Sequence, residues 1–212
     1  VVLNHVPPHI RSVLMERLGK KNTTFIETPY MLPIARAHNV GLRVVPDNSD
    51  VIELQDDVVV PQDMVTRLVA SEYDLPAGWG IRKSWGDWCE RFENRFAVRN
   101  LPYSYVDGKC ILLRSRVREK VGYHNELFVK GVDADYGIRA SAMGFSCGHL
   151  PEPYLVDVGT TTAMGNDAFA QRLHEHARVL AEFLHEHGLI RRRCEPLTDD
   201  WSKCEVTHSD GL

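Results

Sequence analysis

Hydrophobic residues along the first two-thirds of the chain alternate between short continuous runs and helical spacing. The continuous runs, which are typical of buried strands, include VVLNHV, TTFIET, DVIEL and GKCILL. Apolar residues spaced three and four positions apart predict helices over residues 10–18, 34–42, 64–70, 115–121, 133–143 and 166–187. The helix over 166–187 is the longest of these. Strands that alternate with helices predict an α/β fold built on a largely parallel sheet.

Composition narrows the class of protein further. The 212 residues fit one domain, and we expect a compact unit over residues 1–190 followed by a polar, loosely ordered tail over 191–212. A net charge of −4 disfavours binding to nucleic acid or anionic lipid mainly by electrostatics. The sequence has no transmembrane run and no signal-peptide pattern in VVLNHVPPHI, and its five cysteines are widely spaced, so we expect a soluble, cytoplasmic protein.

Two adjacent acids, Asp56 and Asp57, follow the strand-like segment 51–54. Ligands of open α/β sheets bind outside the carboxyl ends of the strands, which is where these two side chains would lie. Neighbouring carboxylates repel each other unless a cation or a proton intervenes, and oxygen ligands suit Mg²⁺ or Mn²⁺. The alternative is a solvated acidic turn before Pro61.

Three motifs occur in a characteristic order: HNVGL, then DVIELQDDVVVP, then GKCILLRSRVREKVGYHNELFVKGVDADYGIRASAMGF. Together they resemble the family 2 glycosyltransferases of the GT-A fold. The resemblance implies an α/β nucleotide-diphospho-sugar transferase with a central, mostly parallel sheet flanked by helices. It also implies metal-dependent, inverting transfer of a sugar from a nucleotide-diphosphate donor to an acceptor hydroxyl. The sequence departs from the family pattern at Gln55 and Val132, which replace two acids.

The resemblance assigns roles to particular acids of this chain. It implies that Asp57, assisted by Asp56, binds a Mn²⁺ or Mg²⁺ ion that bridges the donor diphosphate. It also implies that Asp133 is the catalytic base. Family members often carry a late histidine as a further metal ligand. The comparable strand here, PYLVDVGTTT, offers Asp157 instead, and His208 is a second candidate.

Residues that contact the donor can be assigned in the same way. The first strand of the family leads into the loop that holds the nucleotide, and the corresponding segment here offers Asn4. Asn39 of HNVGL and Asp56 complete the predicted nucleotide-sugar contacts. Neither the nucleotide nor the donor sugar is specified by these residues.

Asp133 and Asp135 open the predicted helix over 133–143, and residues two apart do not share a helix face. Only one of them can therefore point into a cleft. The alternative role for Asp133 is a helix N-cap, and that for Asp135 is a first-turn acid that pairs with Arg139.

Other residue patterns invite functional roles that helix geometry argues against. The chain has ten histidines, including HEH at 174–176 and again at 185–187. On a helix, the apolar stripe of this segment puts these imidazoles on opposite flanks, so one metal ion cannot join them. Trp85, Trp88 and Phe92 follow helical spacing, which favours a core role over sugar stacking for most of them.

Three functions remain open on the sequence. The first is glycosyl transfer to an unknown acceptor, which could be a sugar, a lipid-linked sugar, a protein, a small molecule or a modified nucleic-acid base. The second is a catalytically silent GT-A-like module used for binding or assembly, suggested by Gln55 and Val132. The third is a nucleotidyltransferase on a related sheet.

Overall fold

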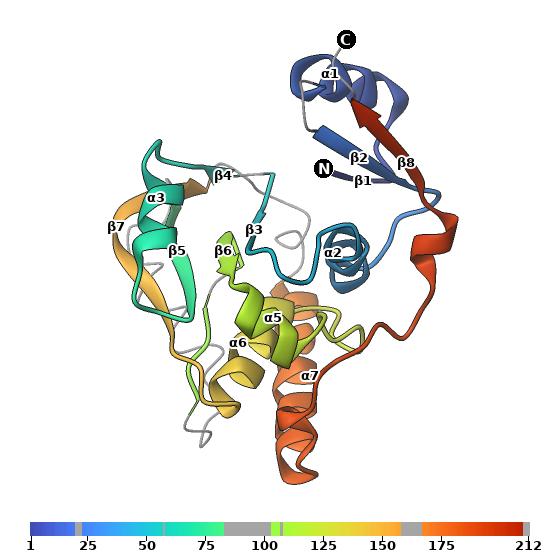
Figure 1. The fold of residues 1–212 in the computed structure, drawn as a ribbon. Coiled ribbons are helices and arrows are strands. Elements are labelled where there is room, and N and C mark those ends of the chain that lie inside the picture. The colour runs from blue at the N-terminus through green and yellow to red at the C-terminus, as the bar shows by residue number, and fades with distance from the viewer. Residues whose placement is uncertain (20–22, 57, 83–102, 107, 158–166, 210–212) are drawn as a thin grey trace.

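The structure, a computed structural model, describes residues 1–19, 23–56, 58–82, 103–106, 108–157 and 167–209 (Figure 1). The strands are β1 (Val2–Asn4), β2 (Thr23–Thr28), β3 (Val51–Leu54), β4 (Val58–Val59), β5 (Leu75–Arg82), β6 (Cys110–Leu113), β7 (Cys147–Asp157) and β8 (Glu205–Ser209). The helices are α1 (Pro8–Leu18), α2 (Ile34–Arg43), α3 (Met64–Ala70), α5 (Ser115–Val121), α6 (Val132–Ala142) and α7 (Asp167–Glu186), with 3-10 turns at Leu189–Arg191 and Asp200–Lys203.

The strands form a five-stranded sheet in the order β3-β6-β5-β7-β4 and a three-stranded sheet in the order β1-β2-β8. Only β5–β7 and β1–β2 pair in parallel among the described strands, whereas β3–β6, β5–β6, β4–β7 and β2–β8 are antiparallel. The chain is therefore mixed α/β, and the prediction of one largely parallel sheet is wrong. Alternation of strands and helices does not fix direction when the strands that pair are distant in sequence.

The five-stranded sheet is covered by helices on both faces, which explains why β6 is buried along its whole length. Ile111 and Leu113 pack into a core with residues of α5 and α6, while Cys110 and Leu112 pack on the opposite face with α3. This alternation follows from the two-residue repeat of a strand. The predicted strand GKCILL is thus confirmed as a central strand, and it anchors the loop that precedes it.

The C-terminal segment, which we expected to be loosely ordered, is part of the fold. β8 pairs with β2 along five residues, so the two ends of the chain meet in the three-stranded sheet (Figure 1). Closer to the core, the backbone of Cys194 bonds to Val121 and Tyr123. The composition of this segment is polar, but its backbone completes one sheet and holds the turn after α5.

Several predicted elements shift by small amounts. The helices at 34–42, 64–70, 115–121 and 133–143 are confirmed within one residue at each end. The strand-like segment PYLVDVGTTT contributes its first residues to the end of β7. The aromatic segment with Trp85, Trp88 and Phe92 lies outside the described residues. Within the described part of the chain, no helix is both long and apolar enough to cross a membrane.

Candidate functional site

The end of β3 and the start of α6 meet at one edge of the five-stranded sheet. The backbone N–H of Gln55 donates to the Lys109 carbonyl at 3.1 Å, which extends the β3–β6 pairing by one residue. The next residue back along the chain, Gly108, donates its N–H to Oδ2 of Asp133 at 2.7 Å. Two hydrogen bonds therefore connect the acidic turn at Asp56 with Asp133.

Asp133 lies in the first turn of α6 and is half-buried. Helix α6 has Gly131 as its N-cap, in the left-handed region with φ of 71°, so the alternative that Asp133 caps the helix is wrong. A Cβ atom added to Gly108 would lie 2.9 Å from the Cβ of Asp133. The glycine thus permits the close backbone approach that fixes the carboxylate.

Asp135 points into the core instead. It is 3% exposed, and its Oδ2 accepts a hydrogen bond from Nε of Arg139 at 2.8 Å. Arg139 also donates to the carbonyls of Val121 and Tyr123, at 2.8 and 2.9 Å. The predicted pairing of Asp135 with Arg139 is confirmed, and the two acids of the first turn have separate surroundings.

The proposed metal ligands can be located only in part. Asp56 is exposed in the turn after β3, whereas Asp57 lies outside the described residues. Val58, which follows it, pairs with Asp157 in the β4–β7 ladder. The backbone of Asp157 is therefore opposite the residue next to Asp57. His208 belongs to the other sheet, where it is exposed and its Nδ1 lies 3.0 Å from the Thr24 hydroxyl.

The two asparagines expected to contact the donor make hydrogen bonds within the protein. Asn4 receives the N–H of Leu32 at 2.8 Å and donates to the carbonyl of the same residue at 2.9 Å. Asn39, which is 2% exposed, receives the N–H of His124 at 2.8 Å and donates to the His124 carbonyl and to Glu126. Both amides hold loops in place.

A buried cluster that the sequence analysis missed lies next to this site. Glu53, in β3, is 2.9 Å from Nδ1 of His38 on α2 and 2.9 Å from Nε2 of His124, after α5. Side-chain exposure rises from 1% at His124 to 10% at Glu53 and 27% at His38. The sequence signal that could have revealed the cluster is the charged residue between Ile52 and Leu54 in a strand. A buried carboxylate needs a partner, so this glutamate indicates that one lies close by.

Electrostatics connect this cluster with Asp133. Burial alone would raise the pKa of Glu53, but the imidazoles of His124 and His38 hold it well below its usual range. Burial lowers the pKa of His38, yet the charges of Glu53 and Asp133 outweigh it and the net shift is upward. Burial lowers the pKa of His149 to about 4, although Asp133 opposes this shift. Asp133 is therefore within electrostatic reach of two imidazoles.

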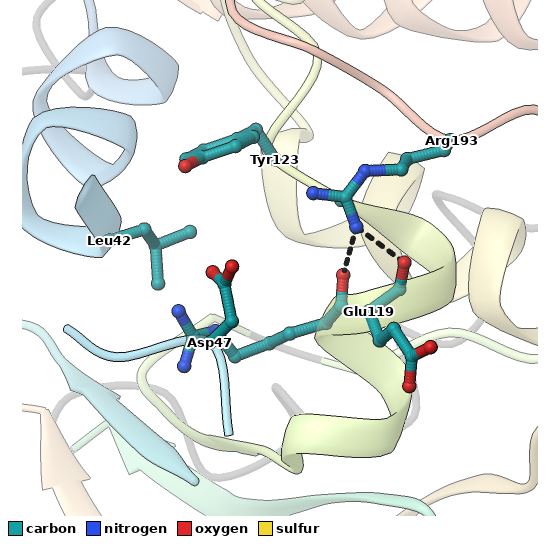
Figure 2. A pocket seen from close by; sticks show the side chains of 7 residues that line it. Leu42, Asp47, Glu119, Tyr123 and Arg193 are labelled. Carbon is teal, nitrogen blue, oxygen red and sulfur yellow. Dashed lines mark hydrogen bonds between the residues drawn. The ribbon is translucent and has the colours of Figure 1, made fainter. Parts of the chain in front are cut away.

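A small hollow of about 60 Å³ lies beside α5 (Figure 2). Its lining residues are Leu42, Asp47, Arg118, Glu119, Gly122, Tyr123 and Arg193. Arg193 donates to the carbonyls of Arg118 and Glu119, which ties the C-terminal segment to the end of α5 (Figure 2). Its volume suits water molecules, whereas a bound nucleotide sugar needs a pocket of several hundred Å³.

The histidines at the end of the chain's longest helix, α7, differ in their surroundings. His176 on α7 and His187, which directly follows the helix, are exposed, while Ala177 and Leu184 on the apolar stripe are buried against α6. His185 on α7 is half-buried, and its ring lies against Tyr103 with centroids 5.7 Å apart. Nδ1 of His187 lies 2.9 Å from the carbonyl of Phe183 in the last turn of α7. The predicted solvated flank is therefore confirmed for His176 and His187, whereas His185 packs against a neighbouring segment.

Comparison with known proteins gives a match in structure alone. No protein-family model matches the sequence, and no curated protein matches it. The fold is similar to that of the mannosyltransferase PcManGT from Pyrobaculum calidifontis in complex with GDP-Man and Mn²⁺, with a TM-score of 0.64 and 15% sequence identity. The match covers 92% of this chain and 55% of the mannosyltransferase chain, so this chain spans about half its length. The likeness establishes a fold shared with a glycosyltransferase.

Proposed function

We propose that this chain is a metal-dependent, inverting glycosyltransferase of the GT-A fold, similar to family 2, that moves a sugar from a nucleotide-diphosphate donor to an acceptor hydroxyl. The observation that carries the proposal is the connection of two acidic positions at one sheet edge. The bonds from Gln55 to Lys109 and from Gly108 to Asp133 bring the acidic turn and the first turn of α6 together. The fold shared with a mannosyltransferase supports the same activity.

The oxygen donors at the end of β3 fit a Mn²⁺ or Mg²⁺ ion. Asp56 is exposed to solvent, and the backbone of Asp157 lies opposite Val58, which directly follows Asp57. Hard divalent cations prefer carboxylates and typically bind one or two of them together with substrate phosphates. In this proposal Asp57 and Asp56 hold the ion, with Asp157 or His208 as further ligands. The bound ion would neutralise charge on the departing diphosphate.

Asp133 is the proposed general base. The residue is half-buried, and the N–H of Gly108 fixes one of its carboxylate oxygens. The acceptor oxygen forms a bond to the anomeric carbon while the bond from that carbon to the diphosphate oxygen breaks, and the hydroxyl proton passes to Asp133. One displacement from the face opposite the leaving group inverts the anomeric centre, and a positioned base contributes about 10²- to 10⁴-fold in rate.

Calorimetric titration with nucleotide sugars in the presence of Mn²⁺ tests the donor assignment. GDP-mannose is the first donor to try, because it is bound by the structural neighbour. We expect binding that needs Mn²⁺ and that is lost in Asp57→Ala and weakened in Asp56→Ala. Asp63→Ala, which removes an exposed acid at the start of α3, is the matched control and should bind like the wild type.

Calorimetry separates the proposal from the first alternative function, and product analysis separates it from the second. A silent binding module, suggested by Gln55 and the buried Val132 at motif positions, would show no metal-linked donor binding. A nucleotidyltransferase would consume a sugar phosphate and a nucleoside triphosphate and release pyrophosphate. In this proposal the acceptor binds in the loops around residues 79–105 or on a partner, and residues 83–102 of that segment lie outside the described residues.

A further inference from the structure

The cluster of His38, Glu53 and His124 has the composition of a transition-metal site. Each residue offers one ligand atom, and these atoms all lie within 4.8 Å of one another. Two imidazole nitrogens and one carboxylate oxygen form a ligand set found in catalytic zinc sites, which keep a fourth position open for water or substrate. Ligand atoms around a tetrahedral zinc ion are about 3.4 Å apart, so the 2.9 Å contacts here would open by about 0.5 Å.

We propose that His38, Glu53 and His124 bind a transition-metal ion of the Zn²⁺ class, at a site distinct from the proposed Mn²⁺ site at Asp56 and Asp57. The ligands come from three separate elements that the fold already brings together. Metal sites of this kind need ligands held close to their final positions, and the contacts around each side chain meet that need.

The cluster is held by the surrounding structure. Glu53 is in register with Ile111 across the β3–β6 ladder, which fixes its backbone in the sheet. Asn39, the residue after His38 on α2, bonds to both the N–H and the carbonyl of His124. The ring of His124 also packs against Tyr136, with ring centroids 4.9 Å apart. One helical residue and one sheet pairing thus position all three ligands.

Charge and accessibility both suit a dication. With two neutral imidazoles the cluster carries the single negative charge of Glu53, which a divalent ion would offset. Nε2 of His124 contacts both carboxylate oxygens of Glu53. Nδ1 of the same ring is buried and has no hydrogen-bond partner among the described residues. His38, at 27% exposure, forms the open side through which an ion and a fourth, water ligand can enter.

The donor atoms also separate this site from the proposed sugar-nucleotide site. Imidazole nitrogen favours Zn²⁺, Co²⁺, Ni²⁺ and Cu²⁺, whereas a set of carboxylates alone favours Mg²⁺ and Mn²⁺. The two sites should therefore fill with different metals, and each can be tested without the other. This inference does not depend on glycosyl transfer.

Co²⁺ titration of the metal-stripped full chain, followed by visible absorption, tests the proposal. We expect one equivalent of Co²⁺ with the spectrum of a nitrogen- and oxygen-ligated tetrahedral site, displaced by one equivalent of Zn²⁺. Glu53→Gln, which keeps the side-chain size, and His38→Gln, at the open edge, should each weaken binding by at least about 100-fold. Circular dichroism identifies any variant that fails to fold. His38→Gln should disturb the fold least, because His38 is the most exposed residue of the cluster.

Matched controls separate this site from other metal binding. His187→Gln changes an exposed histidine directly after α7, and Asp63→Ala removes an exposed acid before α3; both variants should bind Co²⁺ like the wild type. Spectra with thiolate charge-transfer bands would indicate a cysteine site and would overturn the assignment. The absence of stoichiometric binding, or binding unchanged in His38→Gln and Glu53→Gln, would show that the cluster is a hydrogen-bonded ion group without metal.

Discussion

Replacement of Asn39 by alanine separates a structural role for this amide from the donor contact that its sequence motif suggests. The side chain is 2% exposed and makes three hydrogen bonds, at 2.8 and 3.0 Å to the backbone of His124 and at 2.9 Å to Glu126. Each bond contributes about 0.5–1.5 kcal/mol net, and the change leaves its partners buried without replacement. We therefore expect Asn39→Ala to lower the free energy of unfolding by about 2–4 kcal/mol.

Urea denaturation, followed by far-UV circular dichroism, measures this loss directly. For a chain of this size it corresponds to a decrease in Tm of about 4–16 °C. Asn48→Ala, at an exposed asparagine between α2 and β3, is the matched control and should change stability by less than about 0.5 kcal/mol. The reasoning is refuted if Asn39→Ala is as stable as the wild type but loses most of its affinity for the nucleotide sugar.

Two further predictions concern ion pairs of different burial. Arg139→Met should cost about 3–5 kcal/mol of stability in the same denaturation assay, because it leaves the carboxylate of Asp135 buried without its charged partner; a loss below about 1 kcal/mol would contradict this. For Asp74, partial burial opposes ionisation, but hydrogen bonds from Ser146 and Arg116 hold the pKa of the carboxyl below its usual value. A carboxyl whose pKa is lower in the folded than in the unfolded state stabilises the fold at pH values above the unfolded pKa of about 3.9. The wild type should therefore have a higher free energy of unfolding than Asp74→Asn at pH 7, and this difference should disappear as the pH falls below about 4. A difference that does not change with pH would refute this prediction.

The local elements of the fold were predictable because their signals lie in neighbouring residues. Apolar spacing located α2, α3, α5 and α6, and the continuous run at GKCILL located β6. Strand direction was not predictable, because the pairing of β3 with β6 joins segments some sixty residues apart (Val51 with Leu113). The place of β8 in a sheet could not be read from a polar sequence whose stabilising contacts are backbone hydrogen bonds to β2.

In the candidate site, too, local features were predictable from the sequence and long-range contacts were not. The sequence predicted that Asp133 and Asp135 have different surroundings, since helix geometry alone separates them. It did not predict that Gly108 fixes Asp133, because that contact depends on the close approach of two segments. The glutamate inside β3 was visible as an unusual charge, but its partners on α2 and after α5 could be identified only once the three elements were folded together.

Release of nucleoside diphosphate from a nucleotide sugar in the presence of Mn²⁺, compared between wild type and Asp133→Asn, tests the central claim most directly. Asparagine keeps an oxygen that can accept the N–H of Gly108, so the fold and the calorimetric affinity for donor should be unchanged. The account predicts slow donor turnover by the wild type, with water as the acceptor, and a rate about 10²- to 10⁴-fold lower in Asp133→Asn. Turnover in Asp133→Asn equal to that of the wild type would contradict the role of Asp133 as base, and no turnover by the wild type with any donor it binds would contradict the proposed transferase activity.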